Sequence, residues 1–317
     1  MERPVQFGLS VGASLPGVPG RDEIVRLAAR AEAMGFDALH VGDHIQWYAP
    51  ILEPTTVLAT FAAVTARIKI ASDVIILPLR DPVLLAKTMA SLDVLSGGRL
   101  IFGVGAGGDN PKEYAAMRIP MGERGSRTNE SLEIIKGLFE NERFSYRGKH
   151  FLIEDVGIAP RPIQAPVPVW VGGGSEAALR RAARYGHGWM AAFASERKFA
   201  RLAGELRGLL AAEGRSPGDF TFGSFLFINA DGDAARARRM AAAYVNEVYH
   251  LPGEMIVEKF GAAGPVEACV QKTLALAAAG ARYIVLSPLC GYREWPRQLD
   301  HYAELISAVA ATAGEAG

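Results

Sequence analysis

The chain alternates between short apolar runs and longer segments in which apolar residues recur with helical spacing. The runs are rich in β-branched and aromatic side chains, which is typical of buried parallel strands. Eight runs of this kind begin at Val5, Asp37, Ile68, Arg99, Val167, Gly188, Phe220 and Arg282.

The segments between the runs carry helix start and stop signals. The segment 81–97 begins with Asp81 as an N-cap and Pro82 at the first helical position, and it ends at Gly97. Similar patterns predict helices over 21–35, 175–186 and 265–280. Eight strands, each followed by a helix, predict an α/β fold: a (β/α)8 TIM barrel over residues 1–317 as one domain. A doubly wound sheet is the alternative, because it produces the same alternation.

One segment, 141–166, interrupts this alternation. It carries alternating aromatic residues, a turn at Arg147 and Gly148, and prolines at its end. We interpret it as an inserted hairpin followed by coil. An insertion of this kind on a barrel is expected to shape a substrate pocket or to cover an edge.

A glycine pattern follows the fourth apolar run. Gly103, Gly105 and Gly108 match G-x-G-x-x-G, the fingerprint of a dinucleotide site. Such a site needs its glycine turn to open directly into a helix, and an acidic residue about 20 positions later. Here no long apolar face follows, and the next clear helix starts only near Glu123. We therefore interpret these glycines as leaving room for a ring or for backbone at the end of a barrel strand.

Charge and composition narrow the classes of function. The 34 basic and 34 acidic residues cancel, which argues against nucleic acid or an anionic membrane as a partner. No apolar run is long enough to span a membrane, and the amino-terminal residues lack the apolar region of a signal peptide. The two cysteines and six histidines show no metal-binding spacing. We expect a reduced cytosolic protein that binds a small molecule and no metal.

Four segments together resemble the luciferase-like monooxygenase superfamily, whose members are TIM barrels of the bacterial-luciferase type. These segments are "MGFDALHVGDH" (34–44), "PLRDPVLLAKTMASLDVLSGGRLIFGVGAG" (78–107), "ERGSRTNESLEIIKGLF" (123–139) and "PVPVWVGGGSEAALRRAARYGHGWM" (166–190). The resemblance implies a flavin-type cofactor, FMN or the deazaflavin F420, at the C-terminal mouth of the barrel. It also implies a homodimer formed through helices near the second and third strands.

The segment "GDHIQW", from Gly42 to Trp47, resembles the F420-dependent branch of that superfamily. By this resemblance His44 acts beside the reactive ring, as the acid or base or as an orienting residue. Asp43 orients His44 or hydrogen-bonds the cofactor, and Trp47 walls the substrate side of the ring. The alternatives from the residues alone are a core histidine, a turn-capping aspartate and a core tryptophan.

Further positions are assigned to catalysis and to the cofactor ring by the same resemblance. Asp109 is a candidate acid near the end of the fourth strand, although the alignment there is ambiguous because Glu113 and Tyr114 follow one residue late. A cis peptide bond is expected between Asp73 and Val74, behind the cofactor ring, with a regular strand as the alternative. Two glycines at the end of the fourth strand are expected to lie against the ring, Gly105 and Gly107.

The second glycine cluster is the predicted phosphate site. It follows a strand and opens directly into a helix, so free N–H groups and the helix dipole would face an anion. The cluster consists of Gly172, Gly173, Gly174 and Ser175, and the Ser175 hydroxyl adds a donor. A plain strand-to-helix turn is the alternative.

The sequence thus predicts an F420-dependent oxidoreductase that transfers a hydride between F420 and an organic substrate. The loops expected to line the substrate, 45–54, 141–166 and 245–262, hold mixed aromatic and aliphatic residues without a cluster of Lys and Arg. This composition favours an apolar or aromatic substrate over a sugar phosphate. An FMN-dependent monooxygenase and a non-catalytic flavin-binding barrel are the alternatives.

Overall fold

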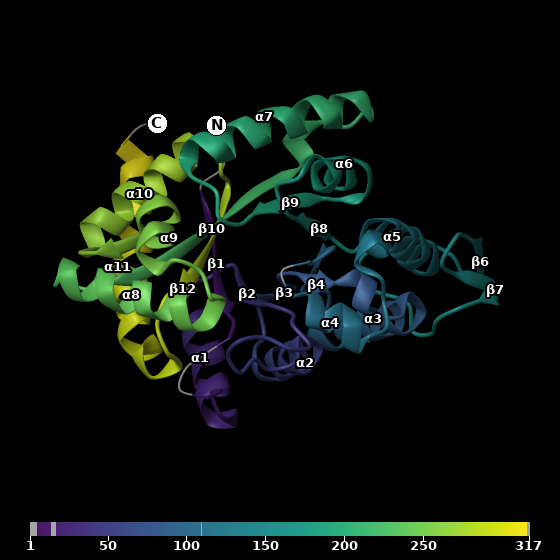
Figure 1. Cartoon of the computed structure of the whole chain (residues 1–317), viewed down its shortest axis with the longest axis horizontal. Helices are drawn as coiled ribbons and strands as arrows, with labels where there is room; N and C mark the ends of the chain where they lie inside the picture. Colours follow the sequence, from purple (N-terminus) through teal and green to yellow (C-terminus); the bar gives the residue numbers. More distant parts are fainter. Residues whose placement is uncertain (1–4, 14–16, 109, 316–317) are drawn as a thin grey trace.

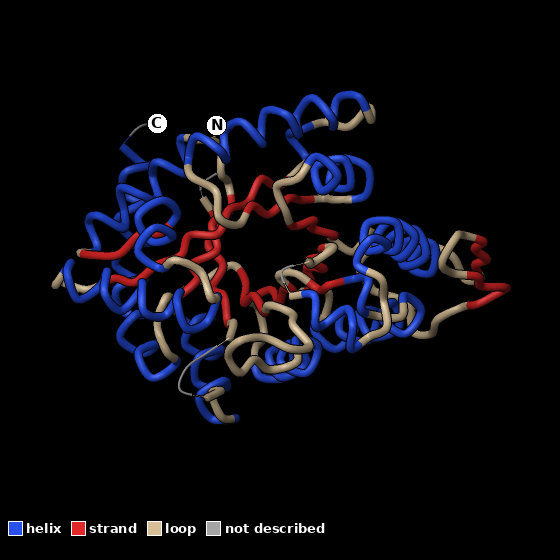
Figure 2. Tube along the Cα trace, viewed as in Figure 1, coloured by secondary structure: helices blue, strands red, loops and turns tan. Residues whose placement is uncertain are grey.

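The computed structural model describes residues 5–13, 17–108 and 110–315, with side chains described up to Thr312. Eight parallel strands form a closed ring that helices surround (Figures 1 and 2). In ring order they are β1 (Gln6–Val11), β2 (Ala38–Val41), β3 (Lys69–Ser72), β5 (Leu100–Gly105), β8 (Val169–Gly172), β9 (Gly188–Ala191), β10 (Thr221–Ala230) and β12 (Tyr283–Pro288).

Each of the eight predicted apolar runs contains one of these strands. The pairing of β9 with β10 and of β12 with β1 closes the ring. The prediction of a TIM barrel is therefore confirmed, and the doubly wound sheet, which has two free edges, is excluded. Two short strands extend the main sheet beyond the ring: β4 (Ile75–Ile76) pairs with the end of β5, and β11 (Gly261–Gly264) pairs with the end of β10.

The helices occupy the connections between strands. They are α1 (Arg21–Ala33), α2 (Pro54–Val64), α3 (Pro82–Ser96), α4 (Pro111–Ala116), α5 (Arg124–Glu140), α6 (Glu176–Tyr185), α7 (Glu196–Ala212), α8 (Ala234–Tyr249), α9 (Gly253–Phe260), α10 (Val266–Ala278) and α11 (Trp295–Glu315). Single 3-10 turns occupy Leu77–Leu79, Met121–Glu123, Pro217–Asp219 and Tyr292–Glu294.

The predicted helix ends are confirmed at α3. The Asp81 carboxylate accepts hydrogen bonds from the amides of Val83 and Leu84, both at 2.9 Å, and Gly97 ends the helix with a φ of 68°. The next long helix after the glycines begins at Arg124, as predicted, but the short helix α4, which the prediction lacked, lies between them. Asn110 caps α4 by accepting from the Lys112 amide at 3.1 Å, a local signal that the weak apolar pattern concealed.

The inserted segment forms the predicted hairpin, in which β6 (Phe144–Arg147) and β7 (Leu152–Val156) are antiparallel, followed by coil. Figure 1 shows the hairpin beyond α5, at one end of the molecule. The Glu130 carboxylate on α5 anchors the hairpin by accepting from the amides of residues 149, 150 and 151.

Whether the segment 141–166 lines the substrate pocket stays a prediction. Its hairpin runs along α5, where Nε2 of His150 lies 2.7 Å from Oγ of Ser126 in the first turn of that helix. The segment connects the end of α5 to the start of β8, so both of its ends lie at the N-terminal end of the barrel. Its coil is fixed there by Gln164, which donates to the Asp93 carboxylate and, at 2.9 Å, to the carbonyl oxygen of Leu100, the first residue of β5.

Glycines in β5 let the neighbouring backbone come close. A Cβ atom on Gly103 would lie 1.9 Å from the carbonyl oxygen of Ser72, and a Cβ atom on Gly105 would lie 2.6 Å from Cγ2 of Val74. The room that these two glycines leave is filled by the chain that follows β3. The glycines were expected to leave room for a ring or for backbone, and at Gly103 it is backbone that fills the room.

This close approach yields a stability prediction. Gly103→Ala should destabilise the protein by about 3 kcal/mol or more, because the new methyl group overlaps a backbone carbonyl that cannot swing away. The control is Gly208→Ala on α7, where no atom lies within 4 Å of the added carbon. That substitution should stabilise the protein by about 0.5–1 kcal/mol. Urea denaturation of both variants measures the difference, and equal midpoints would contradict the assigned contact.

Candidate active site

The C-terminal ends of four adjacent ring strands bring most of the predicted site residues to one rim. Asp43 and His44 follow β2, and the Asp73–Val74 peptide follows β3. Gly107 follows β5, and Gly172–Ser175 ends β8. In a closed parallel barrel these strand ends share one face, the face on which barrel enzymes place their active sites.

His44 is paired with a carboxylate that the sequence prediction did not select. Its Nδ1 lies 3.2 Å from Oε2 of Glu113 and 3.3 Å from Oε1. Glu113 is itself fixed, since Oε1 accepts from the Ile45 amide at 2.7 Å and from the Gln46 amide at 3.2 Å. The Glu113 side chain is only 1% exposed, against 19% for His44. The carboxylate is therefore inside, and the imidazole reaches outward from it.

This pairing determines which nitrogen of His44 is available. An ionised carboxylate can only accept, so Nδ1 carries the hydrogen and Nε2 of the neutral ring is left with its lone pair. Among the described residues, Nε2 has no hydrogen-bond partner. His44 can therefore take a proton at Nε2 or, once protonated, return it, while Glu113 stabilises the charged ring.

Trp47 holds the His44 ring from one face. The two rings stack with centroids 3.7 Å apart and planes 21° apart. Asn110, the cap of α4, donates to the carbonyl oxygen of Gln46 at 2.8 Å and so fastens this loop to the end of β5. Whether Trp47 also walls the substrate side of a bound ring stays a prediction.

Asp43 does not orient His44, in contrast to one of the two expectations for it. Its carboxylate accepts from Nη2 of Arg80 at 2.7 Å, from Nε of Arg80 at 3.0 Å and from the Ile76 amide at 2.9 Å. The side chain is buried, and Arg80 also contacts Glu53 at 3.0 Å. Because these donors occupy both oxygens, Asp43 is a positioning residue that ties β2 to β4.

The peptide bond between Asp73 and Val74 is cis, which confirms that prediction. The Asp73 side chain turns inward, where Oδ2 lies 3.0 Å from Nδ1 of His40, without the alignment of a regular hydrogen bond. Nε2 of His40 in turn lies 3.0 Å from the hydroxyl of Tyr283. Burial raises the pKa of Asp73. The Asp73 side chain is thus part of the barrel interior, and the backbone is what residue 73 presents to the rim.

Three glycines were expected to lie against the cofactor. At each of them, the position that a Cβ atom would occupy is close to a protein side chain. Val74 lies beside two of them, since its methyl groups are 2.6 Å and 2.8 Å from the Cβ positions of Gly105 and Gly172. The corresponding position at Gly107 is 2.7 Å from Cγ2 of Ile76. Packing of the segment 74–76 therefore explains the absence of larger side chains here, and contact of these glycines with a cofactor stays a prediction.

The Gly172–Ser175 loop leads from β8 into α6 as predicted. Ser175 caps the helix by accepting from the Ala178 amide at 3.3 Å, and Trp189 fixes the loop by donating to the carbonyl oxygen of Gly173 at 2.7 Å. Residues 173–177 are exposed. The first amides of a helix have no acceptor within it, so this exposed turn can receive an anion.

Aromatic side chains from several loops gather next to Trp47. Tyr249 contacts Trp47, Phe193 and Phe227 with ring centroids about 6.0–6.2 Å apart. Tyr48 stacks on His250 at 4.0 Å. Burial raises the pKa of Tyr249 to about 12, so this phenol stays neutral at physiological pH. The loops 45–54 and 245–262 therefore meet at the rim, as predicted.

Asp109 lies outside the described residues, and its assignment as an acid stays a prediction. Within the described part of the chain, no three His, Cys, Asp or Glu side chains gather in a way that could hold a metal. Burial raises the pKa of Cys269 and of Cys290 to about 12, so both thiols stay protonated.

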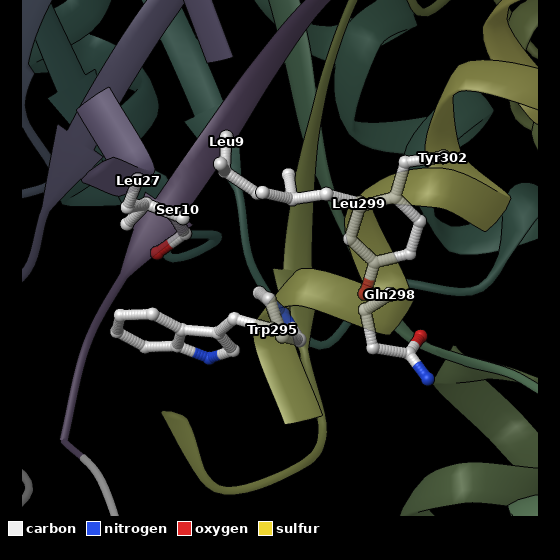
Figure 3. A pocket seen from close by; sticks show the side chains of 8 residues that line it. Leu9, Ser10, Leu27, Trp295, Gln298, Leu299 and Tyr302 are labelled. Carbon is white, nitrogen blue, oxygen red and sulfur yellow. The ribbon is translucent and has the colours of Figure 1, made fainter. Parts of the chain in front are cut away.

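A small cleft elsewhere in the molecule lies outside the barrel wall. Figure 3 shows Trp295, Gln298, Leu299 and Tyr302 of α11 facing Leu9 and Ser10 of β1. These residues join α11 to the outer surface of the ring. The cleft is separate from the C-terminal rim, and none of the predicted site residues lines it.

The fold and this rim define a class: a TIM barrel whose site lies at the C-terminal ends of its strands. Residues 5–263 match the model of the luciferase-like monooxygenase family, and the chain belongs to that family. No helix in the described part of the chain has both the length and the apolar character that a membrane span requires.

Individual relatives differ in what is known of them. An uncharacterized protein of Mycobacterium tuberculosis is 36% identical over 186 residues, covering 52% of this chain and 64% of its own length. An F420-dependent glucose-6-phosphate dehydrogenase of Kineococcus radiotolerans is 29% identical over 245 residues, which cover 74% of this chain and 71% of the relative.

Solved structures share the fold at lower identity. The monooxygenase RslO1 of Streptomyces bottropensis has a TM-score of 0.84 and 23% identity, with 94% of this chain and 98% of that chain covered. An F420-dependent secondary alcohol dehydrogenase with an F420-acetone adduct has a TM-score of 0.83 and 18% identity, with 96% of this chain and 99% of that chain covered. At these identities the similarity shows the barrel alone.

The assignment of Asp43 as a positioning residue predicts a loss of stability. Asp43→Asn should lower the free energy of unfolding by about 3 kcal/mol, because a largely buried arginine loses its main counter-charge. Glu53→Gln is the matched control, since Glu53 contacts the same guanidinium from an exposed position, and it should cost less than about 1 kcal/mol. Urea denaturation compares the two variants, and equal losses would show that Asp43 has no special structural part.

Proposed function

We propose that this protein is an oxidoreductase that uses F420 to exchange a hydride with a small organic substrate. The observation that carries the proposal is the His44–Glu113 pair at the C-terminal rim, which leaves Nε2 of His44 free. The relatives that are F420-dependent glucose-6-phosphate dehydrogenases support the choice of F420.

The rim has groups that suit such a cofactor. The exposed amides of the first turn of α6 suit a phosphate, and Glu176, the acidic residue of that turn, is neutralised by Arg180 at 2.5 Å. The backbone at Asp73 and Val74 and the ends of β5 and β8 would lie along the ring. When bound, F420 supplies a two-electron carrier that accepts or donates a hydride at C5 of its ring.

The residues of the chain manage the proton that accompanies the hydride. For a substrate with a hydroxyl on the reacting carbon, Nε2 of His44 would take the hydroxyl proton during oxidation, as the hydride leaves the C–H bond for F420. In the direction of reduction it would return that proton. Glu113 keeps the hydrogen on Nδ1 and stabilises the imidazolium. Trp47 keeps the imidazole in one plane, so the proton is exchanged at a fixed atom.

The surroundings of His44 favour an apolar or aromatic substrate. Trp47, Tyr249, Phe193 and Phe227 form an aromatic group beside it, and large rings bind organic substrates through buried area. Activity assays should therefore compare apolar or aromatic substrates directly with glucose 6-phosphate. We further propose one barrel domain, a homodimer through helices near β2 and β3, and a cytoplasmic location.

The choice of cofactor is tested by binding. The purified protein should quench F420 fluorescence with a dissociation constant in the micromolar range or below, which corresponds to a binding free energy of about −8 kcal/mol. It should bind FMN much more weakly. Tight binding of FMN without binding of F420 would instead indicate a flavin-dependent monooxygenase, and binding without turnover on any substrate would indicate a flavin-binding protein.

The proton transfer is tested by two substitutions. His44→Asn should lower kcat by about 10²–10⁴-fold, because the proton acceptor is removed, and should leave the dissociation constant of F420 within a small factor of the wild-type value. Glu113→Gln should also lower kcat, because an amide donor facing Nδ1 favours the hydrogen on Nε2. It should change the pH profile of kcat as well. Wild-type rates in His44→Asn would refute the assignment.

A further inference from the structure

Two arginines beside the first turn of α6 have no carboxylate partner among the described residues. Arg181 on α6 donates from Nε to Oδ1 of Asn129 at 2.6 Å and from Nη2 to the carbonyl oxygen of Gly125 at 3.2 Å. Arg124, at the start of α5, donates to the carbonyl oxygen of Met121 at 2.9 Å. All three acceptors are neutral, so neither guanidinium group is in contact with a counter-charge among the described residues.

The nearby carboxylates are already engaged with other cations. Glu123 contacts Arg127 at 2.9 Å and His150 at 3.4 Å. Glu133 contacts Arg184 at 3.4 Å and accepts hydrogen bonds from Tyr146 and Tyr185. Glu176 contacts Arg180 at 2.5 Å. Glu130, another acidic residue of α5, accepts from backbone amides instead, so in the described part of the chain none of these four carboxylates contacts Arg124 or Arg181.

Both guanidinium groups lie close to the rim. A long side chain on a helix leans toward the helix N-terminus, so Arg181 covers the turn before its own position and lies level with the first turns of α6. Nε of Arg124 lies 3.2 Å from the position that a Cβ on Gly108 would occupy. Gly108 follows β5, and β5 pairs with β8, whose end carries Gly172–Ser175. The arginines therefore lie on the α5 side of the strand pair that carries the proposed phosphate loop.

The two charges repel each other. Burial lowers the pKa of Arg181, and the neighbouring charge of Arg124 lowers it further. Like charges held together near a partly buried position cost free energy that an anion placed between them would recover. The arrangement is thus poised for a negatively charged group in addition to any phosphate on the α6 turn.

We propose that Arg124 and Arg181 bind the carboxylates of the F420 tail, which extends beyond the cofactor phosphate, and so select F420 over FMN. The proposal rests on the proposed function. FMN ends at its phosphate, which the α6 turn satisfies, so nothing in FMN reaches the two arginines. F420 continues past its phosphate into an oligoglutamate chain, whose carboxylates match paired guanidinium groups in charge and shape.

The test measures binding by fluorescence titration with three probes: F420 carrying its glutamate tail, the deazaflavin Fo that lacks both phosphate and tail, and FMN. Arg124→Gln and Arg181→Gln should each weaken F420 binding by about tenfold, with Fo and FMN changed less than about twofold. The loss should shrink at high salt, because salt screens exposed charge pairs. Arg181→Lys, which keeps the charge, should recover part of the affinity.

Arg201→Gln on α7 is the matched control, because Arg201 is a helical arginine paired with an exposed carboxylate, Glu205, and has no place in the proposed site. It should leave F420 binding unchanged. Melting temperatures identify any variant that fails to fold, and Arg124 is exposed with a single backbone contact, so its variant tests the proposal even if Arg181→Gln is unstable. Wild-type protein that binds no F420 would refute the proposed function. Tight wild-type binding of F420 that neither variant weakens would refute this inference alone, as would equal weakening of Fo.

Discussion

The rim of this barrel depends on the fit of one side chain, Val74, between two neighbouring strands. Its methyl groups occupy the places that side chains on Gly105 and Gly172 would need. On one side of Val74, the Asp73 side chain is held in the interior beside His40. On the other side, the Ile76 amide is held by Asp43. The ends of β2, β3, β5 and β8 are thereby joined around one residue.

Two carboxylates near His44 have different roles because their hydrogen-bond partners differ. Asp43 accepts from Arg80 with both oxygens and from the Ile76 amide, so its charge is committed to holding β2 and β4 in position. Among the described residues Glu113 has no arginine or lysine partner, and it faces two amides and the imidazole. The negative charge of Glu113 is therefore available to stabilise a positive charge on His44, whereas that of Asp43 is already used.

Much of the architecture could be predicted from local sequence. Eight apolar runs located the eight ring strands, and Asp81, Pro82 and Gly97 marked the ends of α3. The choice between a barrel and an open sheet required the long-range pairing of β12 with β1, which no local pattern carries. The hairpin was predictable from its own alternation, but the end of the barrel on which it lies depends on strand direction in the finished fold.

The site was predicted unevenly for similar reasons. His44 and the cis bond after Asp73 were located through resemblance to the family. Glu113 was passed over in favour of Asp109, because the turn that brings Glu113 to His44 depends on the short helix that Asn110 caps. A signal was available in the Asn110–Pro111 pair, a cap followed by a residue suited to the first helical position. The hydrogen bonds between Arg181 and α5 join residues more than 50 positions apart in the sequence, so no local pattern predicts them.

The hairpin of β6 and β7 has a consequence for how this chain can change over evolutionary time. The tip of the hairpin, residues 149–151, is held by the Glu130 carboxylate, and Nε2 of His150 lies 2.7 Å from Oγ of Ser126 in the first turn of α5. The strands β6 and β7, in contrast, have exposed positions on both sides of the turn. Substitutions at those exposed positions can therefore accumulate without moving the strand ends that carry the site.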